Sequence, residues 1–343
     1  MKSIVIHAAQ DLRIEEREPG VPGPGQVAVA IKRGGICGSD LHYYSHGGFG
    51  VVRLKEPMIL GHEVAGEIVG LGEGVSGLAR GDLVAVSPSR PCGSCSYCQQ
   101  GLHMHCLEML FYGSAMRFPH VQGAFRERLI ADATQCHRLA PGITAEMGAF
   151  AEPFAVTLHA INRAGPLTGR RMLITGCGPI GALAIIAARA HGAREIVATD
   201  VTEFTLAAAR KIGADRAVNV ATDAGAMDAY KANKGTFDVM IEASGNERAL
   251  RLGLDVLKPR GVLVQLGLGG EIALPQNQVV AKEIELRGSF RFHDEFALAV
   301  DLINARRVDL SPLLSEVVPL ARAEEGFKLA SDRSRAVKVQ IAF

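Results

Sequence analysis

The chain has 343 residues, of which 48% are hydrophobic, so its length favours about two domains with enough apolar material for a core in each. Its 37 Lys and Arg residues balance 36 Asp and Glu residues, and this net charge of +1 argues against a protein that binds nucleic acid through the phosphate backbone. The N-terminus has no apolar segment behind a basic start and no small-residue cleavage site, so we predict no signal peptide and a cytoplasmic location.

The first half of the chain has the pattern of a mainly β domain. Short apolar runs at residues 27–31, 64–69 and 83–86 are separated by clusters of Gly and Pro. Such runs, bounded by turn-forming residues, are typical of short strands joined by tight turns.

Four of the seven cysteines lie within fifteen residues, in the spacing C-x2-C-x2-C-x7-C. Four thiolates can close tetrahedrally around Zn²⁺, and such a site leaves no position open for a substrate. We therefore predict a structural zinc lobe at about residues 90–107, with an iron–sulfur cluster as the alternative. The predicted ligands are Cys92, Cys95, Cys98 and Cys106.

A second set of possible metal ligands is dispersed along the chain. It comprises Cys37, the adjacent pair His62 and Glu63, and Glu152. Cys, His and carboxylate ligands that leave one coordination position open would suit a Lewis-acid zinc, which can bind an alcohol oxygen and favour its alkoxide. Taken one at a time, Cys37 is more typical of a small buried hydrophobic residue and Glu152 of a surface acid.

A glycine turn in the middle of the chain has the context of a dinucleotide-binding site. Residues 172–188 hold 17 uncharged residues, but glycines interrupt them, so we expect a strand, a turn and a helix instead of a membrane span. In this turn Gly176 permits the sharp bend, Gly178 allows close approach of a pyrophosphate, and Gly181 allows the helix to pack on the strand. Asp200 ends the next predicted strand, where its carboxylate can bind ribose hydroxyls, so NAD is preferred to NADP.

The alternation of strands and helices continues beyond Asp200 and predicts a parallel sheet with right-handed crossovers. Helices are expected at residues 203–212 and 247–257, and strands at 237–243 and 261–267. After residue 291 we expect two helices, at 294–306 and 323–329, and two strands, at 316–319 and 337–343. This last segment could rejoin the first domain.

Residues 61–66, which read Gly-His-Glu-Val-Ala-Gly, with Gly72 and Val75, resemble the zinc alcohol dehydrogenase signature of the medium-chain dehydrogenase/reductase superfamily. Residues 35–42, the cysteine lobe, the Glu152–Pro153 pair and the glycine turn follow in the order of that family, over essentially the whole chain. The resemblance implies an α/β architecture with a GroES-like, mainly β catalytic domain at residues 1–153 and 291–343. A Rossmann domain with a doubly wound parallel sheet would occupy residues 154–290, in a homodimer or homotetramer.

The chain is most similar to the polyol dehydrogenase branch, which implies two zinc ions per chain. Cys37, His62 and Glu63 would surround the catalytic zinc, and Glu152 would either ligate it or hold its water. Ser39 and His42 match the proton-relay positions of the family, since imidazole can pass a proton to solvent. The matched cofactor positions are Gly176, Gly178, Pro179, Ile180, Gly181, Asp200, Leu266, Gly267, Leu268, Ser289 and Phe290, and the matched substrate positions are Tyr43, Glu152, Arg291 and Phe292. Thr205 departs from the family, because many relatives carry arginine there, and this implies a modest affinity for NAD.

Residues 33–44, 111–125 and 286–292 resemble the L-idonate 5-dehydrogenases within that branch. The resemblance implies NAD-dependent oxidation of the C5 alcohol of a sugar acid, L-idonate, to 5-keto-D-gluconate. A substrate carboxylate needs a cation or several hydrogen-bond donors, for which Arg291, Arg117 and His120 are candidates. A neutral polyol such as sorbitol or xylitol, or L-threonine, is the alternative substrate. A zinc-containing binding or regulatory protein is the alternative of a different class.

Overall fold

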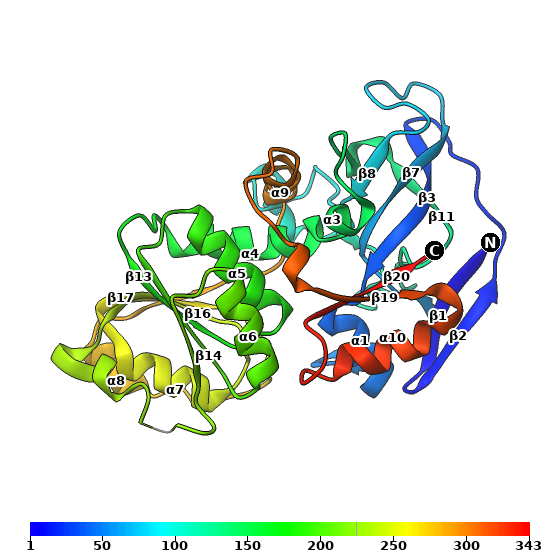
Figure 1. Ribbon diagram of the computed structural model, residues 1–343. Helices are drawn as coiled ribbons and strands as arrows, with labels where there is room; N and C mark the ends of the chain where they lie inside the picture. Colours follow the sequence, from blue (N-terminus) through cyan, green and yellow to red (C-terminus); the bar gives the residue numbers. More distant parts are fainter. Residues whose placement is uncertain (224) are drawn as a thin grey trace.

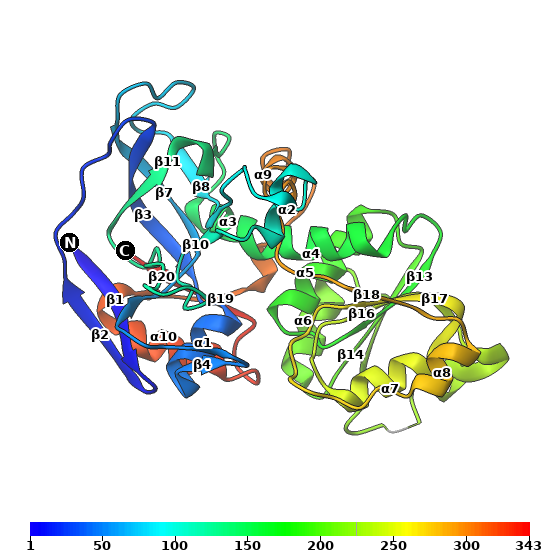
Figure 2. The ribbon, with the colours of Figure 1, turned by 180° about the vertical axis from the view of Figure 1, so that it is seen from behind.

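The computed structural model describes residues 1–223 and 225–343, which form two bodies joined by a helical region (Figure 1). One body holds both ends of the chain, and the other is built from the middle of the sequence. Seen from behind, the loop that carries α2 (Ser96–Gln99) extends from the first body toward the second (Figure 2). The fold is therefore an α/β architecture in which the two ends of the chain meet.

The first body is organised around a seven-stranded sheet in the order β12-β8-β7-β3-β20-β19, with β11 also paired to β3. The C-terminal strand β20 pairs antiparallel with β3, so the tail of the chain does rejoin the first body. Alternate residues of these strands, such as Val27, Val29 and Ile31, are buried in a common apolar core, which fits the period of two of a β-strand. The strands are β3 (Gln26–Gly35), β7 (Glu63–Leu71), β8 (Leu83–Val86), β11 (Arg128–Asp132), β12 (Cys136–Arg138), β19 (Leu314–Pro319) and β20 (Lys338–Ala342).

Smaller elements complete the first body. A three-stranded sheet in the order β2-β1-β6 and two two-stranded ribbons, β4-β5 and β9-β10, lie beside the main sheet. Their bounds are β1 (Lys2–Ala8), β2 (Asp11–Glu16), β4 (Gly48–Phe49), β5 (Val52–Arg53), β6 (Met58–Ile59), β9 (Ser89–Arg90) and β10 (Leu110–Phe111). The helices are α1 (Gly38–His46), α3 (Ala145–Ala149) and α10 (Ala323–Ser331), with short 3-10 turns η1 (His103–His105), η2 (Ala133–Gln135), η4 (Ser311–Leu313) and η5 (Leu320–Arg322).

The second body is a six-stranded parallel sheet in the order β15-β14-β13-β16-β17-β18. From β13 the chain adds β14 and then β15 on one side of the sheet. It then crosses to the other side of β13, where it adds β16, so the strand order reverses next to β13. Ligands of such sheets bind at this reversal, beyond the carboxyl ends of the strands. The elements are β13 (Arg171–Thr175), α5 (Pro179–Ala190), β14 (Glu195–Asp200), α6 (Glu203–Lys211), β15 (Arg216–Asn219), η3 (Asp228–Lys234), β16 (Phe237–Glu242), α7 (Glu247–Val256), β17 (Leu257–Gln265), α8 (Gln276–Ala281) and β18 (Glu285–Gly288).

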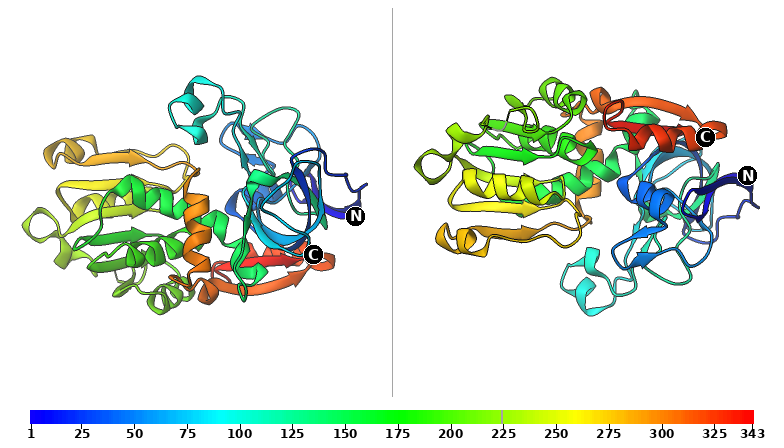
Figure 3. Two further views of the ribbon diagram at one scale, coloured as in Figure 1. Left: turned by 90° about the horizontal axis from the view of Figure 1, so that it is seen from above. Right: turned by 90° about the horizontal axis from the view of Figure 1, so that it is seen from below.

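Helices α4 (Ala151–Ala164) and α9 (Glu295–Asn304) lie at the junction of the two bodies (Figure 3). Helix α4 contributes residues such as Phe154 and Leu158 to a core that also includes Ala65 of the first sheet and Met172 of the second. The domain limit that we expected at residue 153 therefore falls within a continuous helix. None of the described helices is both long and apolar enough to cross a membrane.

Candidate active site

Cys37, His62 and Glu63 come together although 24 residues separate the first two. Their potential ligand atoms, the thiol sulfur, an imidazole nitrogen and a carboxylate oxygen, all lie within 4.8 Å of one another. The pairing of β3 with β7 explains this, because it sets Gly35 opposite Glu63 and so brings the chain just beyond β3 beside the start of β7.

A buried aspartate, Asp40, holds the two ligand-bearing segments together. One of its carboxylate oxygens accepts a hydrogen bond from the backbone amide of Cys37 at 3.0 Å, and the other accepts one from the amide of Gly61 at 3.1 Å. The second oxygen also lies 3.8 Å from Nδ1 of His62. Asp40 was not among the residues expected from the sequence, although an acid three residues into a helix is the position that a capping box uses.

The Glu63 carboxylate forms an ion pair with Lys338, a residue that no sequence motif singled out. The side chains are 1% and 2% exposed, so both charges lie inside the protein. The Lys338 ammonium also donates a hydrogen bond to the carbonyl oxygen of Ile36 at 3.0 Å. Burial raises the pKa of Glu63, and the charges of Lys338 and His62 oppose that rise.

Glu152, near the start of α4, is buried close to the same cluster but is not part of the compact three-residue set. Burial raises its pKa to about 8, and the nearby Glu63 and Cys37 add to the effect. Enclosure by protein and the charge of Glu63 likewise raise the pKa of Cys37 to about 12. Among the described residues, Nδ1 of His62 has no hydrogen-bond partner although it is buried. A divalent cation such as Zn²⁺ would stabilise the charged forms of the neighbouring carboxyl and thiol groups and could use an imidazole nitrogen as a ligand. The composition of the cluster therefore fits such a cation.

The four cysteines of the lobe also converge, with their sulfur atoms within 4.8 Å of one another. Sγ of Cys92 accepts hydrogen bonds from the amides of Ser94 at 3.5 Å and Cys95 at 3.3 Å. Hydrogen bonds of this kind stabilise a thiolate, and those from Ser94 lower the pKa of Cys92 to about 6. The remaining packing is slight: among the described residues, Met109 and Phe111 are the buried side chains that join Cys98 and Cys106 in the local cluster. The lobe therefore has little apolar packing of its own, and its four sulfur atoms are close enough together to hold one metal ion.

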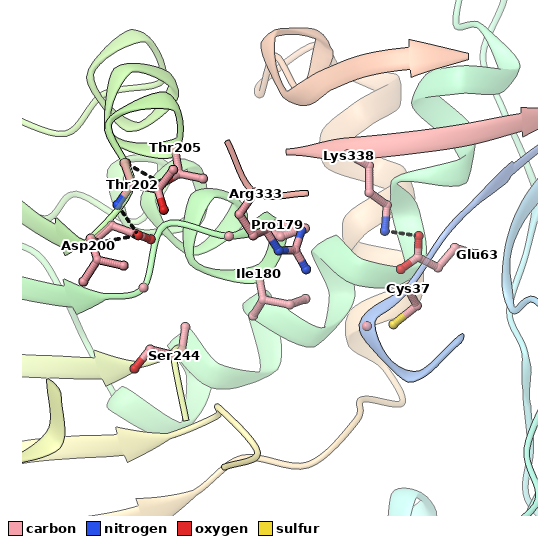
Figure 4. Close-up of a pocket in the computed structure, with 15 residues that line it drawn as sticks. Cys37, Glu63, Pro179, Ile180, Asp200, Thr202, Thr205, Ser244, Arg333 and Lys338 are labelled. Atoms are coloured by element: carbon pink, nitrogen blue, oxygen red, sulfur yellow. Dashed lines mark hydrogen bonds and ion pairs between the residues drawn. The ribbon is translucent and has the colours of Figure 1, made fainter. Parts of the chain in front are cut away.

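A cavity of about 340 Å³ lies between the glycine turn and the Glu63–Lys338 pair (Figure 4). Gly176 has φ of +84°, and a Cβ there would lie 2.9 Å from Ser244, so the turn requires glycine. A Cβ on Gly181 would lie 1.7 Å from the carbonyl oxygen of Gly176, which shows how closely α5 packs against the turn. The residues that line the cavity are Cys37, Gly38, Glu63, Gly176, Gly178, Pro179, Ile180, Asp200, Val201, Thr202, Thr205, Ala243, Ser244, Arg333 and Lys338.

Asp200 stands at the end of β14, where the sequence predicts it. Its carboxylate accepts hydrogen bonds from the amides of Cys177 and Val201, both at 2.6 Å, and from the amide of Thr202 at 3.0 Å. These bonds fix the carboxylate at the edge of the cavity beside the glycine turn. Arg333 and Lys338, from the far end of the chain, line the same cavity, and neither was expected there from the sequence.

The other predicted cofactor residues do not line this cavity. Leu266, Gly267 and Leu268 follow β17, and Ser289 and Phe290 follow β18, so they lie beyond the carboxyl ends of their strands. Leu268 is 77% exposed and Phe290 is 40% exposed.

Arg291 is held between the two bodies by aromatic and sulfur contacts. Its guanidinium lies 4.1 Å from the ring centre of Phe111, and Nη2 lies 3.0 Å from Sδ of Met116. Burial lowers the pKa of Arg291 to about 10, while the charges of Glu152 and Tyr43 oppose that shift. The side chain lines a second cavity, of about 170 Å³.

Three other predicted substrate residues have different surroundings. The hydroxyl of Tyr43 accepts a hydrogen bond from the amide of Ala115 at 2.9 Å, and Phe292 is only 1% exposed and stacks on Phe296 in the core. Arg117 lines the second cavity, where it pairs with Glu108 at 2.5 Å.

His120 is occupied by the backbone on both sides of its ring. Nε2 accepts from the amide of Lys55 at 2.8 Å, and Nδ1 lies 2.8 Å from the carbonyl oxygen of Arg117. Both ring nitrogens are thus used to hold the loop, which leaves neither for a substrate carboxylate.

Ser39 and His42 lie one turn apart on α1, which begins immediately after Cys37. Residues three apart share a face of a helix. Ser39 is half-buried and His42 is exposed, so this face leads from the ligand cluster to the protein surface. Partial burial and the nearby His46 lower the pKa of His42.

Two family models match the chain. The alcohol dehydrogenase GroES-like domain matches residues 23–141, and the zinc-binding dehydrogenase model matches residues 179–305. The chain is 45% identical to L-idonate 5-dehydrogenase (NAD(P)(+)) of Escherichia coli over 316 residues, which cover 92% of this chain and 91% of the relative. It is 32% identical to sorbitol dehydrogenase of Gallus gallus over 343 residues, which cover 99% of this chain and 95% of the relative.

Solved structures show the same likeness. The crystal structure of L-idonate 5-dehydrogenase from Escherichia coli superposes with a TM-score of 0.96 at 42% identity, covering 100% of this chain and 98% of the other. The structure of 2R,3R-butanediol dehydrogenase from Bacillus subtilis superposes with a TM-score of 0.88 at 29% identity, covering 100% and 99% of the two chains.

Proposed function

This chain belongs to the zinc-binding alcohol dehydrogenase family, and we propose that it oxidises the C5 hydroxyl of L-idonate to 5-keto-D-gluconate with transfer of hydride to NAD⁺. The observation that carries the substrate class is the Arg291 guanidinium, a half-buried cation that lies over the ring of Phe111 and lines the second cavity. A guanidinium binds a carboxylate with two parallel hydrogen bonds, so a sugar acid fits this position better than a neutral polyol.

The two clusters of possible ligands support two zinc ions per chain. Cys37, His62 and either Glu63 or Glu152 would hold the catalytic one, and the four lobe cysteines would hold the structural one. When bound at the first site, zinc supplies a Lewis acid that makes the alcohol proton easier to remove. The described cysteines form no disulfides, which supports a reducing compartment such as the cytoplasm.

Ser39 and His42 would carry the alcohol proton to solvent. The half-buried Ser39 hydroxyl takes the proton and passes its own to His42, which is exposed. Partial burial and the nearby His46 lower the pKa of His42, which favours the neutral ring that is able to accept a proton.

The experiment that tests the function is the initial rate of NADH formation from L-idonate, sorbitol, xylitol and L-threonine, with and without a chelator. We expect L-idonate to be the best substrate and the chelator to abolish its oxidation. Strong turnover of sorbitol without turnover of L-idonate would show that the substrate is a neutral polyol. One zinc per chain and no turnover of any substrate would indicate a binding or regulatory protein instead.

Replacing Arg291 by methionine is expected to lower kcat/KM for L-idonate by about 100-fold, because charge-assisted hydrogen bonds to the carboxylate are lost. The rate with sorbitol, which has no carboxylate, should change by less than about threefold. Steady-state kinetics on both substrates measure the difference. Arg322→Met is the matched control, since Arg322 is an exposed arginine that pairs with Glu325 and does not line the second cavity. An equal loss on both substrates would contradict a carboxylate-binding role.

Replacing Asp200 by alanine is expected to raise KM for NAD⁺ by about tenfold, because hydrogen bonds between the carboxylate and the ribose are lost. The same change removes the repulsion of a 2′-phosphate, so kcat/KM for NADP⁺ should rise relative to that for NAD⁺. Glu203→Ala, which removes an exposed acid from the neighbouring helix, is the control. A wild-type enzyme that prefers NADP⁺ would contradict the role assigned to Asp200.

A further inference from the structure

The loop between β18 and α9 carries Arg291 in an unusual backbone conformation. Arg291 has φ of +55°, in the left-handed region that residues other than glycine rarely adopt. Such a conformation persists where the surrounding structure holds it, and it is concentrated at functional sites. On one side of the loop, Phe292 is buried in the core and stacks on Phe296. Contacts on the other side must therefore help to fix a conformation that the loop would not adopt by itself.

The four-cysteine lobe contacts this loop on both sides of Arg291. The ring of His103 stacks on that of His293, with centroids 4.0 Å apart, and the ring of His105 stacks on that of Phe290 at 6.0 Å. Both lobe histidines belong to the 3-10 turn η1. Figure 2 shows the lobe next to α9, the helix into which the loop leads. One turn of the first body thus holds the residue before Arg291 and a residue shortly after it.

The lobe also forms part of the surroundings of the Arg291 side chain. Cys106 and Leu107 line the second cavity together with Arg291. The guanidinium lies 5.0 Å from the ring centre of Phe290, which is the ring that His105 contacts from the lobe. A displacement of the lobe would therefore move both a wall of this cavity and a ring beside the guanidinium.

We propose that His103 and His105 are positioning residues that hold Arg291 where its guanidinium meets the carboxylate of the sugar acid. The inference rests on the proposed function, in which Arg291 binds that carboxylate. Two parallel hydrogen bonds form only when the guanidinium and the carboxylate are aligned, so the placement of the loop matters for affinity. A loop that is already ordered also avoids the entropic cost of becoming ordered when the substrate binds. The lobe would then contribute to the preference for an acidic substrate.

The test compares the zinc-loaded, full-length wild type with the double variant His103→Ala/His105→Ala. We expect KM for L-idonate to rise by about 3- to 10-fold with little change in kcat, because two ring contacts that hold the loop are lost. The kinetics with sorbitol, which has no carboxylate, should stay close to those of the wild type. Gln99→Ala is the matched control, because Gln99 is an exposed residue of α2 in the same lobe and takes part in neither ring contact.

Further variants separate positioning from general damage to the lobe. In an Arg291→Met background the two alanine changes should have no further effect on kcat/KM for L-idonate, because the group that they position is absent. Replacing both histidines by phenylalanine, which keeps rings able to stack, should restore the wild-type KM. His293→Ala removes the closer contact from the loop side and should raise KM without altering the lobe. Zinc content and melting temperature check that each variant is intact.

Hydrogen exchange of the amides of residues 289–293, measured without substrate, reports directly on the order of the loop. It should be faster in the alanine double variant than in the wild type. Unchanged exchange, or an equal loss of kcat/KM with and without Arg291, would overturn the proposal. If the wild type does not oxidise L-idonate, the proposed function fails, and the exchange measurement still decides whether the lobe holds the loop.

Discussion

Replacing Cys37 by alanine is expected to lower kcat for L-idonate oxidation by at least about 10³-fold, because a catalytic metal stabilises the reacting oxygen by several kcal/mol. The thiol is one of three groups whose ligand atoms lie within 4.8 Å of one another, so its removal leaves an incomplete site. Metal analysis should show the loss of about one zinc per chain, with the other retained by the four-cysteine lobe.

Cys136→Ala is the matched control for this prediction. Cys136 is also a free cysteine in the first body, on β12, but it belongs to neither group of potential ligands. The control should keep both its zinc content and its activity, with at most a modest loss of stability. Full zinc content and wild-type turnover in Cys37→Ala would contradict the assignment of Cys37 as a ligand.

The sequence was sufficient to identify those parts of the site whose signal is local. The His62–Glu63 pair, the four-cysteine spacing and the glycine turn each lie within a short window, and the structure places each of them in a cluster or a cavity. Arg333 and Lys338 could not be found in this way, because their positions depend on the pairing of β20 with β3. That pairing sets Gln340 opposite Gly35, about 300 residues away in the sequence.

The secondary structure shows the same difference between elements with a clear local signal in the sequence and elements without one. Strands β15 and β18, which are the two edge strands of the parallel sheet, were not expected from the sequence. Within β15 only Val218 is fully buried, and β18 is exposed or half-buried throughout, so neither has the apolar run that indicates a central strand. Helix α4 was also not expected: most of its residues are buried, and its polar side is short, with His159, Asn162 and Arg163 near its end.

Lys338→Met is expected to lower the free energy of unfolding by about 3–5 kcal/mol, because it leaves the buried carboxylate of Glu63 without its counter-charge. Both side chains are almost fully enclosed, so little water reaches the carboxylate that loses its partner. The carbonyl oxygen of Ile36 loses its donor in the same step. Denaturant or thermal unfolding of the full-length protein measures the effect. Lys328→Met on α10 is the control, because its ion pair with Glu324 is exposed and its loss should leave the unfolding midpoint unchanged.

A double variant separates the ion pair from the packing of the lysine. Adding Glu63→Gln to Lys338→Met removes both charges, so the double variant should be more stable than Lys338→Met alone. If Lys338 instead acts only by filling space, the second change would bring no recovery, since the methionine side chain would still be the one that packs there. Activity should stay low in the double variant even where stability returns, because Glu63 is also a candidate zinc ligand. Recovery of stability without recovery of turnover would thus show that one carboxylate serves both the fold and the chemistry.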